Sequence, residues 1–267
     1  MPSQTTIDAL IARNRRRHVA TAARVAAVVT AVVGCGYYTG LLDVPRLWDG
    51  VADIADLVAE SLPPDFRNWR DWLRPLWDTL AMSVAGTALA VAISFPLGLL
   101  AARNTSPHAS VYYVARTMLN ALRSVPEVIM GIIFVAAVGF GALPGVLALG
   151  LHSVGMIGKF FAEAIEHAAD APVEAARAAG GTPLQVVFHG VLPQVFPHML
   201  DTVMYRWEYN FRASTVLGLV GAGGIGFQML GALRILEYRE VSALLLVVLA
   251  MVTVIDAISG HLRKKLK

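Results

Sequence analysis

The stretch EAARAAGGTPLQVVFHGVLPQ, residues 174–194, decides how the rest of the chain is interpreted. Four alanines between Glu174 and Gly180 favour a helix with little side-chain bulk, so another protein can approach it closely. Gly180 and Gly181 end that helix, and Pro183 suits the first turn of a second one. The stretch therefore predicts a helix-turn-helix elbow with Glu174 available to a basic partner. The alternative is an alanine-rich connector that binds nothing.

Composition indicates that this elbow belongs to a membrane protein. Of the 267 residues, 56% are hydrophobic and only 15% are charged, with a mean hydropathy of +0.60. Soluble proteins carry about a quarter charged residues, so the surplus apolar surface requires a lipid environment. The single cysteine, Cys35, excludes an internal disulfide framework and a paired-cysteine metal site. The basic residues gather at the chain ends, which fits membrane anchors better than nucleic-acid binding.

Apolar runs predict an all-α integral membrane protein with six spans. About 20 helical residues cross a hydrocarbon core of about 30 Å. The expected spans are residues 19–42, 76–102, 122–140, 143–165, 195–220 and 240–262. A cleaved signal peptide would have a shorter apolar part than residues 19–42 and a small-residue cleavage site after it, and neither feature is present.

The charge distribution predicts the orientation of these spans. Basic residues mark the cytoplasmic side, so residues 1–18 and the C-terminal tail are both expected inside. The acid-rich residues 43–75 are then periplasmic, and Val51, Ile54 and Val58 predict within them an amphipathic helix on the membrane surface. Residues 76–267 form the core domain. Within it, residues 170–193 face the cytoplasm and residues 221–239 form a glycine-rich outer segment.

The fifth expected span carries charges that need an explanation. Charges inside a span are costly and usually face a pathway or one another. Glu208 and Arg212 are four residues apart and are expected to pair, whereas Arg206 lies about 200° round the helix from Glu208. Our hypothesis is that Arg206 offers a transient positive site to an anion. The alternative is that Arg206 snorkels or pairs with another helix.

Two further segments are candidate functional elements. RSVPE, residues 123–127, begins the third expected span, where Ser124 can cap the helix and Pro126 fits its first turn or a kink. His152 lies within the next span, and an interhelical hydrogen bond is expected for it because no Cys, Asp or second His stands nearby at metal-ligand spacing.

GAGGIG, residues 221–226, fits the dinucleotide-binding pattern G-x-G-x-x-G. A membrane-bound enzyme would need a strand before this loop and a βαβ unit around it, but expected spans flank it instead. The chain also lacks the pattern GxxxxGK[ST], so any ATP hydrolysis must reside in a partner. The glycines are expected to allow tight turns and close helix approach beside the outer mouth of a pathway.

The elbow resembles the EAA motif of ABC importer permeases, a short cytoplasmic helix that docks into a groove of the ATP-binding subunit. Glu174, Ala175 and Ala176 are followed by Gly180, and Gly190 stands where the motif has isoleucine. The residues that the resemblance assigns to coupling are Glu174, Ala175, Ala176, Gly180, Thr182, Leu192 and Pro193.

TLAMSVAGTALAVAISFPLGLLAARN, RSVPEVIMGIIFVAAVGFG and YRWEYNFRASTVLGLVGAGGIGFQ extend the likeness over almost all of residues 79–267. They resemble the permeases of phosphonate ABC transporters, including relatives that carry phosphite or phosphate. The resemblance implies a type I (methionine-importer-like) fold in the bacterial inner membrane. It also implies a homodimer on two ATPase subunits, fed by a periplasmic binding protein, with ATP and Mg bound by the partner and no cofactor on this chain.

The same likeness implies alternating access through a pathway between the protomers. The candidate pathway and gate residues are Ser124, Pro126, Glu127, Arg206, Glu208, Arg212, Gly221, Gly223 and Gly224. Two alternatives stay open at this point. One is a permease of the same fold for another small solute, and the other is a secondary transporter or channel that needs no ATPase.

Overall fold

The computed structural model describes residues 4–266; for residues 4–13, 16 and 266 it describes the backbone alone. Every regular element in this part of the chain is a helix. The chain divides into two compact units, and the division falls between Glu60 and Ser61. Each unit is described by itself.

The first unit consists of α1 (Gln4–Tyr38) and α2 (Val44–Glu60). The apolar part of α1, Arg17–Tyr38, is long enough to cross a membrane. A turn at Gly40, whose φ is +77°, joins the two helices. No residue of α2 is buried, so the apolar stripe through Val51, Ile54 and Val58 is available to a surface outside this unit.

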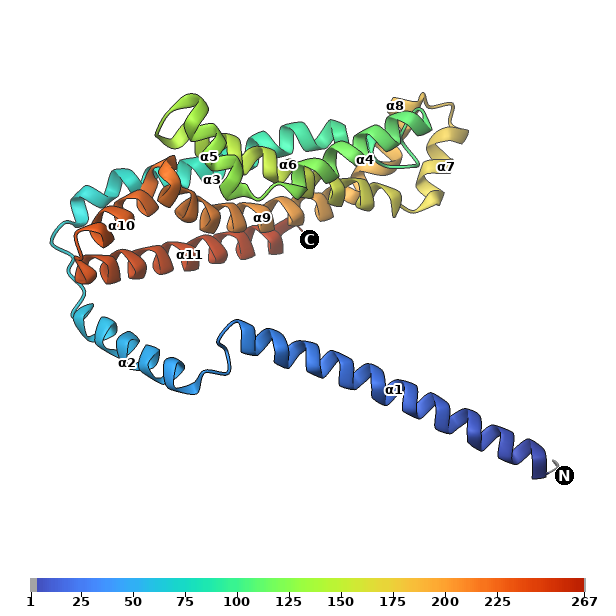
Figure 1. Cartoon of the computed structure of the whole chain (residues 1–267). Coiled ribbons are helices and arrows are strands. Elements are labelled where there is room, and N and C mark those ends of the chain that lie inside the picture. Colours follow the sequence, from blue (N-terminus) through green and yellow to red (C-terminus); the bar gives the residue numbers. More distant parts are fainter. Residues whose placement is uncertain (1–3, 267) are drawn as a thin grey trace. The chain divides into compact units, whose positions relative to one another are not determined.

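The second unit is a helical bundle built around α6 (Ala142–Glu166). Its other long helices are α3 (Trp69–Leu100), α4 (Ala109–Ser124), α9 (Leu192–Leu217) and α11 (Tyr238–Leu266), and they run alongside one another in Figure 1. Glycines let α3 and α6 approach closely: a Cβ on Gly86 would lie 3.0 Å from that of Leu149. Gly98 meets Phe161 in the same way, at 2.9 Å.

The third expected span, residues 122–140, differs from the structure. The chain breaks there into α4 and α5 (Glu127–Val138), which meet at 85°. Val125 is extended (φ −87°, ψ 121°) because the ring of Pro126 disfavours a helical residue before it. Ser124 therefore ends α4, its Oγ donating to the carbonyl of Asn120, and does not cap the following helix.

Within residues 4–266, four helices are long and apolar enough to cross a membrane: Arg17–Tyr38, Trp69–Leu100, Ala142–Glu166 and Tyr238–Lys265. Two bent pairs pass the same test together, namely α4 with α5 at 85° and Pro183–Ala222 with α10 (Gly224–Arg234) at 58°. The total reaches six if each bent pair crosses once.

The glycine-rich segment packs tightly at the second of these bends. Gly221, in the π-helical turn η2 (Gly218–Ala222), has a φ of +103°, and a Cβ there would lie 2.7 Å from the ring of Phe140. Gly223 and Gly224 also have positive φ, at +77° and +70°. The N–H of Ile225 donates to Thr79 Oγ1 at 2.8 Å. The residues before the loop are helical, so the strand required by a dinucleotide-binding enzyme is not there.

Candidate functional site

The elbow expected at residues 174–194 consists of α7 (Asp170–Ala178), α8 (Pro183–Val186) and the π-helical turn η1 (Val187–Val191). In Figure 1, α7 and α8 lie at the end of the bundle away from α10. Gly180, with a φ of +81°, turns the chain after α7. Thr182 and Gln185 then form a reciprocal capping box at the start of α8.

The surface of the elbow is open to a partner. Glu174 is exposed on α7 and lines a cavity of about 380 Å³ with Arg177 and the loop residues Asn104 and Thr105. Gly190, where the EAA motif has isoleucine, lies against the backbone of α7: a Cβ there would be 3.1 Å from the Cα of Val173. The close backbone contact gives a physical reason for this departure. Leu192 and Pro193 begin α9.

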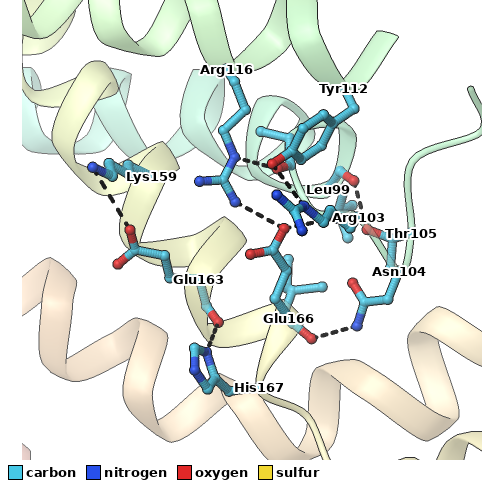
Figure 2. Close-up of polar contacts among 12 residues, drawn as sticks. Leu99, Arg103, Asn104, Thr105, Tyr112, Arg116, Lys159, Glu163, Glu166 and His167 are labelled. Carbon is cyan, nitrogen blue, oxygen red and sulfur yellow. Dashed lines mark hydrogen bonds and ion pairs between the residues drawn. The ribbon is translucent and has the colours of Figure 1, made fainter. Parts of the chain in front are cut away.

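A polar cluster connects the end of α6, which leads into the elbow, with α4 and the loop after α3 (Figure 2). Glu166, the last residue of α6, pairs with Arg116 of α4 at 2.9 Å and accepts from the backbone N–H of Arg103 at 2.9 Å. Both arginines stack on the ring of Tyr112, and Arg116 Nε also donates to the carbonyl of Ala101. Sequence reasoning did not assemble this cluster, because Glu166 lies 50 residues beyond Arg116 along the chain.

A second polar network is buried among α3, α6 and α9. Arg206 on α9 is only 2% exposed, and its Nε donates to Ser153 Oγ at 2.9 Å. Ser153 donates to the side-chain oxygen of Asn210 at 3.0 Å, and Asn210 donates to Thr87 Oγ1 at 2.9 Å. None of the ion pairs among the described residues includes Arg206, and its Nη2 has no hydrogen-bond partner among them.

A carboxylate at the α4–α5 break lies next to this network. Glu127, the first residue of α5, accepts from the hydroxyl of Tyr209 at 2.7 Å and lies 3.0 Å from His152 Nε2. The other ring nitrogen of His152 lies 3.0 Å from the carbonyl of Val125. The interhelical hydrogen bond expected for His152 is therefore present. The Arg206 guanidinium stacks 4.2 Å from the centre of the Tyr209 ring.

The prediction that Glu208 and Arg212 form an ion pair is wrong. Glu208 binds Arg263 of α11 at 2.6 Å, and Arg212 binds Asp256 of α11 at 3.4 Å. Spacing along one helix allows a pair but cannot exclude a better partner on a neighbouring helix, and α11 supplies one for each residue. The described residues contain no group of three or more His, Cys, Asp or Glu able to hold a metal ion.

A bundle of membrane-crossing helices with an open elbow at one end and a charged network inside defines a transport permease, of the class that ABC importers use. The chain belongs to the family of binding-protein-dependent transport system inner membrane components, whose model matches residues 94–267.

Two curated relatives are similar to this chain over a larger part of its length than the family model covers. The phosphite transport system permease protein PtxC of Stutzerimonas stutzeri is 66% identical over 91% of this chain and 89% of its own length. The phosphate-import permease protein PhnE of Mycolicibacterium smegmatis is 40% identical over 79% of this chain and 40% of its own length.

Solved structures agree on the fold. A chain of the inward-facing MetNI methionine ABC transporter matches with a TM-score of 0.65 at 23% identity, covering 73% of this chain and 96% of that one. An amino acid ABC transporter matches with a TM-score of 0.62 at 16% identity, over 76% of this chain and all of that one. The chain thus has the type I importer permease fold that the sequence predicts.

Proposed function

We propose that this chain is the membrane-spanning subunit of an ATP-driven importer for small phosphorus oxyanions, with phosphite as the first candidate cargo. The 66% identity with a phosphite permease along nine-tenths of the chain carries the proposal. Relatives named for phosphite and for phosphate at about 40% identity support the wider class, which includes phosphonates. Soluble binding proteins set most of the selectivity in such systems, so the exact cargo depends on that partner.

In this proposal the elbow couples ATP hydrolysis to transport. Glu174, Ala175, Ala176 and Gly180 dock into a partner ATPase, with Thr182, Leu192 and Pro193 completing the connection to α9. The exposure of Glu174 and the rigid capping box at Thr182 support this role. ATP and Mg bind to the partner, and this chain needs no cofactor of its own. Movement of the elbow then alternates the access of the pathway between the two sides.

The proposed assembly contains two copies of this chain, two ATPase subunits and a periplasmic binding protein. Both chain termini are cytoplasmic in this arrangement, and α2 lies on the outer membrane surface. The apolar stripe of α2 and the basic residues at the chain ends support this orientation.

The proposed pathway runs beside Arg206, the charged group of the buried network that lacks a carboxylate partner. The α4–α5 break at Ser124, Pro126 and Glu127 forms its gate, and the glycine segment at Gly221, Gly223 and Gly224 supports its outer end. Glu208 and Arg212 were candidates for the same pathway. Their ion pairs with α11 favour a structural role instead, holding α9 against that helix.

Affinity purification of the tagged chain from its native host tests the proposal. The expected result is co-purification of an ATPase whose hydrolysis rises when the binding protein is loaded with phosphite. Adding methylphosphonate or phosphate in place of phosphite then ranks the cargo. A chain that purifies without an ATPase and still transports would favour the secondary-transporter alternative.

A further inference from the structure

The carboxylate of Glu127 contacts side chains that could otherwise donate hydrogen bonds to an oxyanion. Tyr209 on α9 donates to one of its oxygens at 2.7 Å, and His152 on α6 lies 3.0 Å from the other. Glu127 itself begins α5, directly after the 85° break. A single carboxylate at a bend in the chain thus connects three helices of the second unit.

The His152–Glu127 pair carries no net charge. The carbonyl oxygen of Val125 can only accept, so the contact at 3.0 Å places a hydrogen on His152 Nδ1. The contact between His152 Nε2 and Glu127 then needs one more hydrogen, on the ring or on the carboxyl group. In both cases the charges of the two groups sum to zero. The net charge of Arg206, His152 and Glu127 together is therefore +1, contributed by the Arg206 guanidinium.

Arg206 has unused hydrogen-bonding capacity beside the same pair. Its guanidinium stacks on the ring of Tyr209, whose hydroxyl holds Glu127, and its Nη2 is buried without a partner among the described residues. A buried arginine without a counter-ion is costly, and an anion at this position would offset that cost. Oxyanions suit this set of donors because several of their oxygens can accept charge-assisted hydrogen bonds at once.

We propose that Glu127 is an internal counter-ion that closes an oxyanion site formed by Arg206, His152 and Tyr209. The arriving oxyanion takes the place of the Glu127 carboxylate at His152 and Tyr209, and its negative charge also satisfies Arg206. Glu127 leaves by movement of α5 about the break at Pro126. This inference rests on the proposed function, because it assigns the phosphorus oxyanion to a particular site on this chain.

Calorimetric titration with inorganic phosphite tests the proposal. The sample is the permease with its ATPase in lipid nanodiscs, without the binding protein. Wild type is expected to bind weakly, and Glu127→Ala to bind at least about tenfold more tightly because the competing carboxylate is gone. Adding Arg206→Ala to Glu127→Ala should return binding to the wild-type level. Glu163→Ala, in the partly exposed pair with Lys159, is the matched control and should bind as wild type does.

A second variant covers the case in which Glu127→Ala does not assemble. Glu127→Gln keeps the size of the side chain and removes its charge, and it should also bind phosphite more tightly than wild type. Binding no tighter than wild type in an assembled variant would overturn the proposal, as would a gain that persists without Arg206. Normal ATP-driven uptake by wild type combined with that result would refute only the role of Glu127, whereas absent uptake would refute the proposed function.

Discussion

The carbonyl oxygen of Thr215 on α9 fills the space that a side chain on Gly226 of α10 would need. A Cβ on Gly226 would lie 1.8 Å from that oxygen, far inside van der Waals contact. The two helices meet at the 58° bend, which depends on this contact and on the positive φ of Gly221, Gly223 and Gly224. The glycine pattern is thus explained by helix packing, without a nucleotide.

Gly226→Ala should therefore destabilise the permease by about 1–3 kcal/mol or more, the usual cost of overpacking. Gly231→Ala, in the same helix, is the control because nothing lies within 4 Å of its Cβ position. That change should leave the protein unaffected or gain up to about 1 kcal/mol from helix propensity. Thermal unfolding in detergent measures both. Equal melting temperatures for the two variants would contradict this account of the bend.

Arg206→Ala should lower cargo uptake at least about tenfold, because it removes the buried positive charge that the proposed pathway offers. Arg212→Gln is the control, since its ion pair with Asp256 is about half exposed and contributes at most about 1 kcal/mol. The initial rate of uptake is measured after gel filtration has verified that each complex is assembled. Unchanged uptake in Arg206→Ala would remove Arg206 from the pathway.

Glu174→Ala should uncouple the ATPase from transport. The side chain is exposed on α7, so its loss leaves the fold intact while weakening the contact with a basic partner. The expected result is loss of the stimulation of ATP hydrolysis by loaded binding protein, with a normal melting temperature. Glu163→Gln, which changes a partly exposed side chain on α6, should retain that stimulation. Full stimulation in Glu174→Ala would place the coupling contact elsewhere.

Stability should depend on pH through Glu237, between α10 and α11. A hydrogen bond with Glu240 raises the pKa of Glu237, and the Glu240 charge acts in the same direction. A carboxyl group whose pKa is higher in the folded state stabilises the fold below its unfolded pKa of about 4.3, and this contribution is lost as pH rises through the folded pKa. Melting temperatures measured from pH 4 to pH 8 should therefore fall less in Glu237→Gln than in wild type. Parallel curves would show that Glu237 contributes nothing.

Local signals in the sequence predicted the features that depend on neighbouring residues. Gly180 and Pro183 indicated the elbow as a helix stop and a helix start, signals that act within a few residues. Long uncharged runs likewise indicated membrane-crossing helices. The break at Pro126 was only half predicted, because proline signals a kink or a first helical turn equally well, and the structure has a bend of 85°.

Partners from distant helices were beyond sequence reasoning. Helical spacing suggested that Arg212 would pair with Glu208, but Asp256 lies 44 residues away along the chain and binds it instead. Glu127, Tyr209 and His152 meet only because α5, α9 and α6 pack together. A single sequence carries the identity of such residues but not their proximity.

Phosphite uptake by proteoliposomes containing the permease, its ATPase and the binding protein tests the central claim most directly. The account predicts accumulation that requires both ATP inside the vesicle, where the ATPase lies, and loaded binding protein outside. Phosphite accumulation without nucleotide would contradict it. So would an assembled complex that hydrolyses ATP in response to its binding protein yet accumulates no phosphite, phosphate or phosphonate.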